Sequence, residues 1–205
     1  RAAASRPAVR LGQRFIRLTT EVVVRRPALW RLFRRVTRRA FDRLAPVWDG
    51  MRRADTLAPA EAALERLPAA PRRALDLGTG TGAVARLLAG RYAEAEIVGV
   101  DLSERMVAEA RRLTDSPRIT YSVADASQLP FADGQFELVT LGNMIPFFDE
   151  LSRVVAPGGH VLVAFSAGAE TPIYVPAKRL RDELGRRGFT EFAEVSAGRG
   201  TALLA

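Results

Sequence analysis

The sequence of 205 residues contains no cysteine, one histidine and one lysine. The absence of cysteine excludes disulfides and thiolate metal sites and fits a reducing compartment, so we expect a cytoplasmic protein. One histidine excludes a metal site built from several histidines of one chain, and we expect no bound metal ion. No apolar run approaches the roughly 18 residues of a membrane-spanning helix, and no segment resembles the apolar core of a signal peptide.

Positive charge is concentrated at the start of the chain. Residues 1–73 carry 18 arginines and 6 acids, whereas residues 74–205 carry 13 basic and 17 acidic residues. The length and a hydrophobic content of 48% predict one main core with an appendage. We therefore expect a basic helical extension over residues 1–45 and an α/β domain over residues 46–205.

Apolar residues recur at helical spacing in two segments that Pro27 separates. The first stripe contains Leu11, Phe15, Leu18 and Val22. The second contains Leu29, Leu32, Phe33, Val36, Ala40 and Leu44, opposite Arg31, Arg34, Arg35, Arg38 and Arg39. Three interpretations stay open: a cap on the core, contact with an anionic membrane surface or a protein partner, and contact with nucleic acid. We favour the cap for residues 28–45 and a surface role for residues 8–26; nucleic acid is the least favoured.

Residues 74–82, with the sequence ALDLGTGTG, predict a buried strand, a glycine-rich turn and a helix over residues 82–89. Glycines allow a tight turn and a close approach of a ligand to the backbone. The free N–H groups at the helix start favour negative charge. Asp76, just before this turn, suggests a ligand that also carries a cation. An amino-acid-like group fits this pattern better than a pyrophosphate.

Two further acids follow predicted strands. Asp101 ends the strand over residues 97–101, at the distance from the turn where such folds place a carboxylate on ribose hydroxyls. Asp125 follows the strand over residues 119–123, where a carboxylate could accept from an exocyclic amine such as that of adenine. The three acids together describe an amino acid joined to an adenosine.

The remaining pattern alternates helix and strand, which predicts a parallel sheet with helices on both faces. Helices are expected over residues 103–112 with Ser103 as N-cap, 147–155 and 176–187. Strands are expected over residues 136–141 and 161–166, followed by a hairpin of residues 189–196 and 201–204.

The ordered motifs resemble those of the class I S-adenosylmethionine (SAM)-dependent methyltransferases. They are DLGTGTG (76–82), VGVDLS (98–103) with Met106, ADA (124–126) with LPF (129–131), FELV (136–139) and RVVAPGG (153–159). The resemblance implies a Rossmann-like, doubly wound, mostly parallel sheet of seven strands whose last strand is antiparallel. It also implies SAM as cofactor and S-adenosylhomocysteine as product. The implied cofactor-binding residues are Asp76, Gly78, Thr79, Gly80, Gly82, Asp101, Leu102, Met106, Asp125, Ala126, Leu141 and Gly142.

Residues 41–49 resemble the segment that opens the quinone-biosynthesis branch of this family, where it covers the bound SAM. Trp48 would belong to that cover, or to ordinary packing. The connector after residue 141 is shorter than in that branch, so the resemblance alone does not identify the acceptor.

No residue stands out as a catalytic base. His160 follows the turn of residues 157–159 and should lie at the edge of the sheet away from the ligand. Asp133, Asp149 and Glu150 lie nearer the right edge, but acids in such positions are more often solvated. Asn143, with Pro146 and Phe147, resembles the Asn-Pro-Pro-aromatic motif of amino-group methyltransferases only faintly, because the spacing differs.

The favoured function is therefore SAM-dependent methyl transfer to a small molecule, with a lipophilic acceptor among the options. The alternative is a SAM-binding regulatory or assembly protein without catalysis. A nicotinamide-dependent oxidoreductase is disfavoured because it would require Gly-x-Gly-x-x-Gly and leaves Asp76 and Asp125 without a role. The acceptor, the methylated atom and the oligomeric state stay open.

Overall fold

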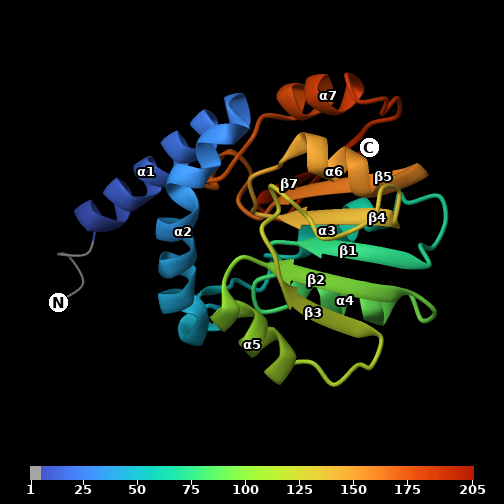
Figure 1. The fold of residues 1–205 in the computed structure, drawn as a ribbon, viewed down its shortest axis with the longest axis horizontal. Helices are drawn as coiled ribbons and strands as arrows, with labels where there is room; N and C mark the ends of the chain where they lie inside the picture. Colours follow the sequence, from blue (N-terminus) through green and yellow to red (C-terminus); the bar gives the residue numbers. More distant parts are fainter. Residues whose placement is uncertain (1–5) are drawn as a thin grey trace.

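The computed structural model describes the backbone of residues 6–205 and the side chains of residues 13–205. Leu11 of the predicted first stripe lies outside the described side chains. The centre is a seven-stranded sheet in the order β3-β2-β1-β4-β5-β7-β6 (Figure 1). Its strands are β1 (Arg73–Leu77), β2 (Glu96–Asp101), β3 (Ile119–Val123), β4 (Phe136–Gly142), β5 (Val155–Phe165), β6 (Ala193–Ala197) and β7 (Gly200–Leu204). Only β7 runs antiparallel to its neighbours β5 and β6, which confirms the predicted fold class.

Helices cover both faces of this sheet. They are α1 (Arg6–Arg25), α2 (Trp30–Leu44), α3 (Ala58–Leu64), α4 (Ala83–Arg91), α5 (Glu104–Arg112), α6 (Phe148–Val154) and α7 (Ala177–Gly185). Buried side chains of α3, α4 and α5 pack on one face of the sheet. Those of α6 and α7 pack on the other face, together with residues from the end of α1 and the start of α2. None of the described helices is long and apolar enough to cross a membrane.

The central strand β1 explains why the site forms where it does. Ala74 and Leu75 are completely buried and belong to the two opposite layers of the core, as expected for a parallel strand covered on both faces. β1, β2, β3 and β4 run parallel, so their carboxyl ends meet at one edge. Asp76, Asp101 and Asp125 are therefore brought to the same edge of the sheet.

Two predicted elements differ from the structure, and one helix was not predicted. β5 begins at Val155 rather than residue 161, because the turn of residues 157–159 forms an irregularity inside the strand instead of preceding it. The hairpin is confirmed, but its first strand begins only at Ala193. The alanine-rich α3, with Pro59 in its first turn, was not predicted.

Only part of the predicted apolar stripe of α2 faces the body of the protein. Trp30 is buried and Phe33, Phe41 and Leu44 are partly buried, whereas Leu32 and Val36 are 64% and 56% exposed. In α1 the buried residues are Thr19, Thr20, Val23 and Val24, while Phe15 and Leu18 of the predicted stripe are exposed. The apolar arc of each helix is wider than the strip that packs on the body, so much of both stripes faces solvent.

Candidate cofactor site

The glycine-rich turn between β1 and α4 forms the floor of the candidate site. Gly78, Gly80 and Gly82 have φ angles of +65°, +54° and +83°, a conformation that favours glycine. The turn is closed by Thr79, whose N–H donates to the Val100 carbonyl at 2.9 Å. Glycine at positions 78 and 80 therefore gives the tight turn that the sequence predicted.

Asp76 lies beneath this turn and is fully buried. Its two carboxylate oxygens accept from the hydroxyls of Thr79 at 2.6 Å and Thr140 at 3.0 Å. Burial raises the pKa of Asp76 from 3.8 to about 6, although these hydrogen bonds oppose the shift. Sequence reasoning missed Thr140, which becomes recognisable once β4 is known to pair with β1 in the register Asp76↔Thr140.

Asp101 at the end of β2 is held against the same turn. Its carboxylate accepts from the N–H of Gly80 at 2.9 Å and the N–H of Ser103 at 2.8 Å. Burial raises its pKa, and the nearby charge of Asp42 acts in the same direction. Asp42 of α2 in turn accepts from the Ser103 hydroxyl at 2.6 Å. The predicted pair of Asp101 and the glycine turn is thus confirmed as a spatial neighbourhood.

Two apolar side chains cover the turn. The indole nitrogen of Trp48 would be 3.4 Å from a Cβ added to Gly80, and the sulfur of Met144 would be 2.6 Å from one added to Gly78. Asp49, next to Trp48, accepts from the Thr81 hydroxyl and fastens this segment to the turn. Residues 48–49 therefore lie over the turn, where the resemblance to the quinone-biosynthesis branch implied a cover. Met144 also lies over the turn, which the sequence did not indicate.

Asp125 also lies at this edge, but a residue of the extension engages it. The Trp30 indole N–H donates to its carboxylate at 2.9 Å, as do the N–H and hydroxyl of Ser127 at 3.0 and 2.7 Å. Arg34 lies 3.7 Å away. Trp30 packs edge to face on Phe147, with ring centroids 5.5 Å apart. Trp30 lies 95 residues before Asp125 in the sequence, so no local pattern indicated this hydrogen bond.

The other predicted cofactor residues lie close to this edge or beneath it. Met106, Ala126 and Leu141 are buried, whereas Leu102 and Gly142 are partly buried. Gly82 has a packing role in addition, because a Cβ there would collide with the Tyr121 hydroxyl.

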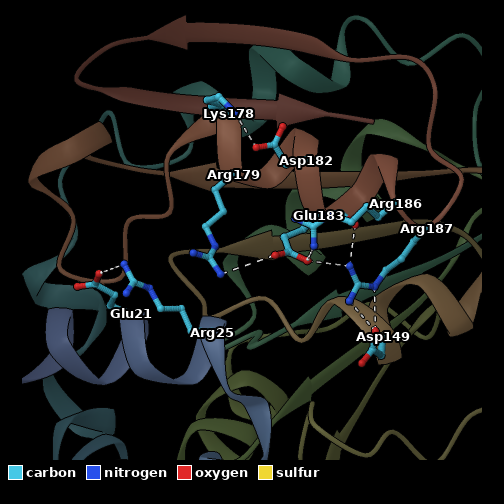
Figure 2. Close-up of polar contacts among 9 residues, drawn as sticks. All are labelled: Glu21, Arg25, Asp149, Lys178, Arg179, Asp182, Glu183, Arg186 and Arg187. Atoms are coloured by element: carbon cyan, nitrogen blue, oxygen red, sulfur yellow. Dashed lines mark hydrogen bonds and ion pairs between the residues drawn. The ribbon is translucent and has the colours of Figure 1, made fainter.

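The three acids considered as bases are all paired with arginine. Asp149 accepts from Arg187 at 2.7 Å, and Figure 2 shows how Arg187 also reaches Glu183. Asp133 and Glu150 both pair with Arg153, at 2.9 and 2.7 Å. The Arg153 hydrogen bonds lower the pKa of Glu150, so it is a poorer proton acceptor than a free carboxylate.

Neither Asn143 nor His160 is available for chemistry at the turn. The Asn143 amide exchanges two hydrogen bonds of 2.9 Å with Ser166, which fixes the end of β4 to the end of β5. Its φ of +51° is tolerated because asparagine adopts this region more readily than other side chains. His160 lines a cavity of about 660 Å³ beside Phe189 and Leu204, which contains none of the predicted cofactor residues. The prediction that His160 lies at the other edge is confirmed.

Comparison with known proteins gives consistent relatives. Residues 74–159 match the family model described as a methyltransferase domain. A demethylmenaquinone methyltransferase of Thermus thermophilus is 39% identical over 137 residues, 60% of this chain and 62% of that protein. A malonyl-(acyl-carrier protein) O-methyltransferase of Halorhodospira halophila is 39% identical over 149 residues, 67% of this chain and 50% of the relative. A trans-aconitate 2-methyltransferase of Methylobacterium nodulans is 38% identical and is covered to 50%. The chain thus spans between half and just under two thirds of these relatives.

Solved structures support the fold. A SAM-dependent methyltransferase from Aquifex aeolicus superposes with a TM-score of 0.67 at 16% identity, covering 80% of this chain and 96% of that one. A methyltransferase solved with the Trm112 activator of Haloferax volcanii gives a TM-score of 0.68 at 20% identity. The sheet order, the glycine turn with its acids and the sequence relatives agree. This chain is therefore similar in sequence and in fold to the class I SAM-dependent methyltransferases.

Proposed function

We propose that this chain binds SAM at the glycine turn and transfers its methyl group to a small-molecule acceptor. The observation that carries the proposal is the convergence of Asp76, Asp101 and the left-handed glycines at one edge of a parallel sheet. SAM carries an ammonium and a sulfonium together with a carboxylate. A glycine turn at the start of α4, with Asp76 buried beneath it and Asp101 beside it, is complementary to that combination of charges.

The residues present fit the cofactor in kind and position. Asp101 would accept from the ribose hydroxyls, since it ends β2 beside the turn. Gly78 and Gly80 would contact the methionine half, because a Cβ at either position would fill the cradle against Met144 or Trp48. Asp125 would accept from the adenine amine, and the Trp30 hydrogen bond would orient its carboxylate.

Bound SAM supplies a methyl group on a positively charged sulfur, and the leaving thioether is neutral. The chain has to align the acceptor, exclude water and tolerate the spreading positive charge. Trp48 and Met144 are suited to excluding water above the turn, because their side chains lie against Gly80 and Gly78. The buried carboxylate of Asp76 favours positive charge close to the turn.

The kinds of acceptor are limited, because none of the three acids weighed as bases is free among the side chains of residues 13–205. Asp133, Asp149 and Glu150 are paired with arginine, so an acceptor that needs deprotonation would receive no help from them. We therefore propose a carbon, a thiolate or an already ionised oxygen as the nucleophile. The apolar run Met144, Ile145, Phe147 and Phe148 on the acceptor side favours a lipophilic molecule. The relatives are named for methyl transfer to demethylmenaquinone, to a malonyl-(acyl-carrier protein) and to trans-aconitate. These acceptors offer nucleophiles of the kinds proposed here.

An acceptor screen tests the proposal. The full chain is incubated with methyl-labelled SAM and pools of quinone precursors, carboxylic acids and thiols, and labelled products are identified by mass spectrometry. Labelled product together with S-adenosylhomocysteine is expected, and Asp101→Ala should abolish both at limiting SAM. SAM binding without turnover in any pool would favour the alternative of a regulatory SAM-binding protein.

A further inference from the structure

Large apolar side chains are exposed almost only on the first part of the chain. Of the eight large hydrophobic residues exposed among the described side chains, seven lie between Phe15 and Met51. Four of them, Phe15, Leu18, Leu32 and Val36, are 50–64% exposed and lie on α1 and α2; we refer to them as the α1–α2 outer face. Scattered single exposures need no explanation, but a concentration on two adjacent helices does.

One aromatic contact joins the two helices at this face. Phe15 packs edge to face on Phe33, with ring centroids 6.4 Å apart. Leu18 lies one helical turn from Phe15, and Leu32 and Val36 lie beside Phe33 on α2. The four side chains therefore lie at this contact or within one helical turn of it on their own helices. Figure 1 shows α1 and α2 projecting from one side of the sheet domain, with α1 reaching outward.

Arginines border this surface. Arg31, Arg35, Arg38, Arg39 and Arg43 are exposed on α2, and within the side chains of residues 13–205 none of them forms an ion pair. The acids Glu21 and Asp42 do not neutralise these arginines, because Glu21 pairs with Arg25 and Asp42 accepts from Ser103. The α1–α2 outer face thus combines exposed apolar groups with uncompensated positive charge.

We propose that the α1–α2 outer face binds the surface of an anionic lipid bilayer, with its apolar side chains in the headgroup region. Helices with an apolar stripe and an arginine-rich flank are suited to lying in this interface. A second copy of the chain would bring the same arginines face to face, which is unfavourable. Nucleic acid would use the arginines but would leave the apolar surface in water.

Docking would also place the cofactor site close to the lipid. α2 carries the outer face on one side and contacts the candidate site on the other, because Trp30 donates to Asp125 and Asp42 accepts from Ser103, whose N–H donates to Asp101. A lipid-soluble acceptor would then reach the site without crossing water. This inference goes beyond the proposed methyl transfer, because bilayer binding is measured without turnover and can fail or succeed independently.

Vesicle sedimentation with the full chain tests the proposal. We expect binding to vesicles of phosphatidylcholine and phosphatidylglycerol at low salt, weak binding at high salt, and little binding to phosphatidylcholine alone. The double substitution L32S/V36S should weaken binding about tenfold or more, because both side chains are already exposed and contribute mainly in the bilayer. R35Q/R39Q should weaken it roughly 30-fold, corresponding to about 1 kcal/mol for each arginine.

Matched controls separate the face from general stickiness and charge. Val123 is 46% exposed on β3, and Arg91 is exposed on α4, so neither belongs to the α1–α2 outer face. V123S and R91Q should bind vesicles like the wild type, and all variants should show unchanged thermal unfolding. Absence of sedimentation with anionic vesicles at low salt would overturn the proposal. So would equal binding by L32S/V36S and the wild type, or a lipid-free dimer that L32S/V36S dissociates.

Discussion

Asp76 illustrates how a single residue links the stability of this fold to its ligand. The carboxyl is completely buried, and two threonine hydroxyls satisfy its oxygens. Burial nevertheless raises its pKa to about 6, so the folded protein holds a charge at neutral pH that its surroundings disfavour. A bound cation would relieve that cost, which is why we regard Asp76 as part of the cofactor site and not only of the core.

The pKa of Asp76 predicts a specific pH dependence of stability. The unfolded chain has an ordinary carboxyl with a pKa of 3.8, and the folded chain has one of about 6. Between these values the folded state binds more protons, so the free energy of unfolding should fall as pH rises, by about 3 kcal/mol in all, and level off above the higher value. Urea unfolding of wild type and Asp76→Asn across this range measures the effect.

Asp76→Asn should lack this decline, because the amide does not titrate. The exposed Asp115 provides a matched control, and Asp115→Asn should retain the wild-type slope. Parallel curves for wild type and Asp76→Asn would show that the Asp76 pKa is not raised.

Gly80 is the second residue whose conformation makes a prediction. Its φ is +54°, and an added Cβ would be 3.4 Å from the Trp48 indole nitrogen. Gly80→Val should therefore abolish SAM binding and lower the free energy of unfolding by roughly 1–3 kcal/mol. Gly90 has nothing within 4 Å of an added Cβ, so Gly90→Ala should leave SAM affinity unchanged. Near-normal affinity in a folded Gly80→Val protein would remove the turn from the cofactor site.

At the scale of elements, the sequence correctly predicted features that depend on residues close together in the chain. Ser103 was predicted as the N-cap of α5, and its hydroxyl accepts from the Met106 N–H at 3.1 Å. The mostly parallel sheet with its antiparallel last strand and the glycine turn followed from patterning and motif resemblance. The packing face of α2 did not follow, because its apolar residues span a wide arc and only contacts with distant residues select the strip around Trp30 and Phe41. The Trp30–Asp125 and Thr140–Asp76 hydrogen bonds were equally invisible, since each joins segments far apart in sequence.

Ser103 allows the link between α2 and α5 to be tested as an element-scale prediction. Its completely buried hydroxyl caps α5 and also donates to Asp42. Ser103→Ala should lower the free energy of unfolding by about 1–2 kcal/mol, because the cap is lost and the Asp42 carboxylate loses a donor. Equilibrium unfolding in urea measures the change. Asp42→Asn keeps the cap and should cost less; an equal cost for both variants would place the effect in the α2 contact alone.

At the scale of the whole molecule, residues 74–205 are net acidic and residues 1–73 are strongly basic, and α2 of the basic part contacts the candidate site. Its inner side contacts the cofactor edge, whereas its outer side is apolar and flanked by arginines. The difference in net charge between residues 1–73 and residues 74–205 could be read directly from the sequence. The assignment of residues 1–45 to a separate extension stays a prediction. Trp30 of this segment is buried in the main core, so the segment packs closely on the rest of the protein.

Calorimetric titration of the full chain with SAM tests the central claim most directly. One site per chain is expected for SAM and for S-adenosylhomocysteine, and none for NAD. Asp101→Ala removes the acceptor that the Gly80 N–H and the ribose hydroxyls would share, so affinity should fall by roughly 1.5–3 kcal/mol, about 10- to 150-fold. Absence of SAM binding by the folded wild type, or unchanged affinity in Asp101→Ala, would contradict the assignment of the cofactor site.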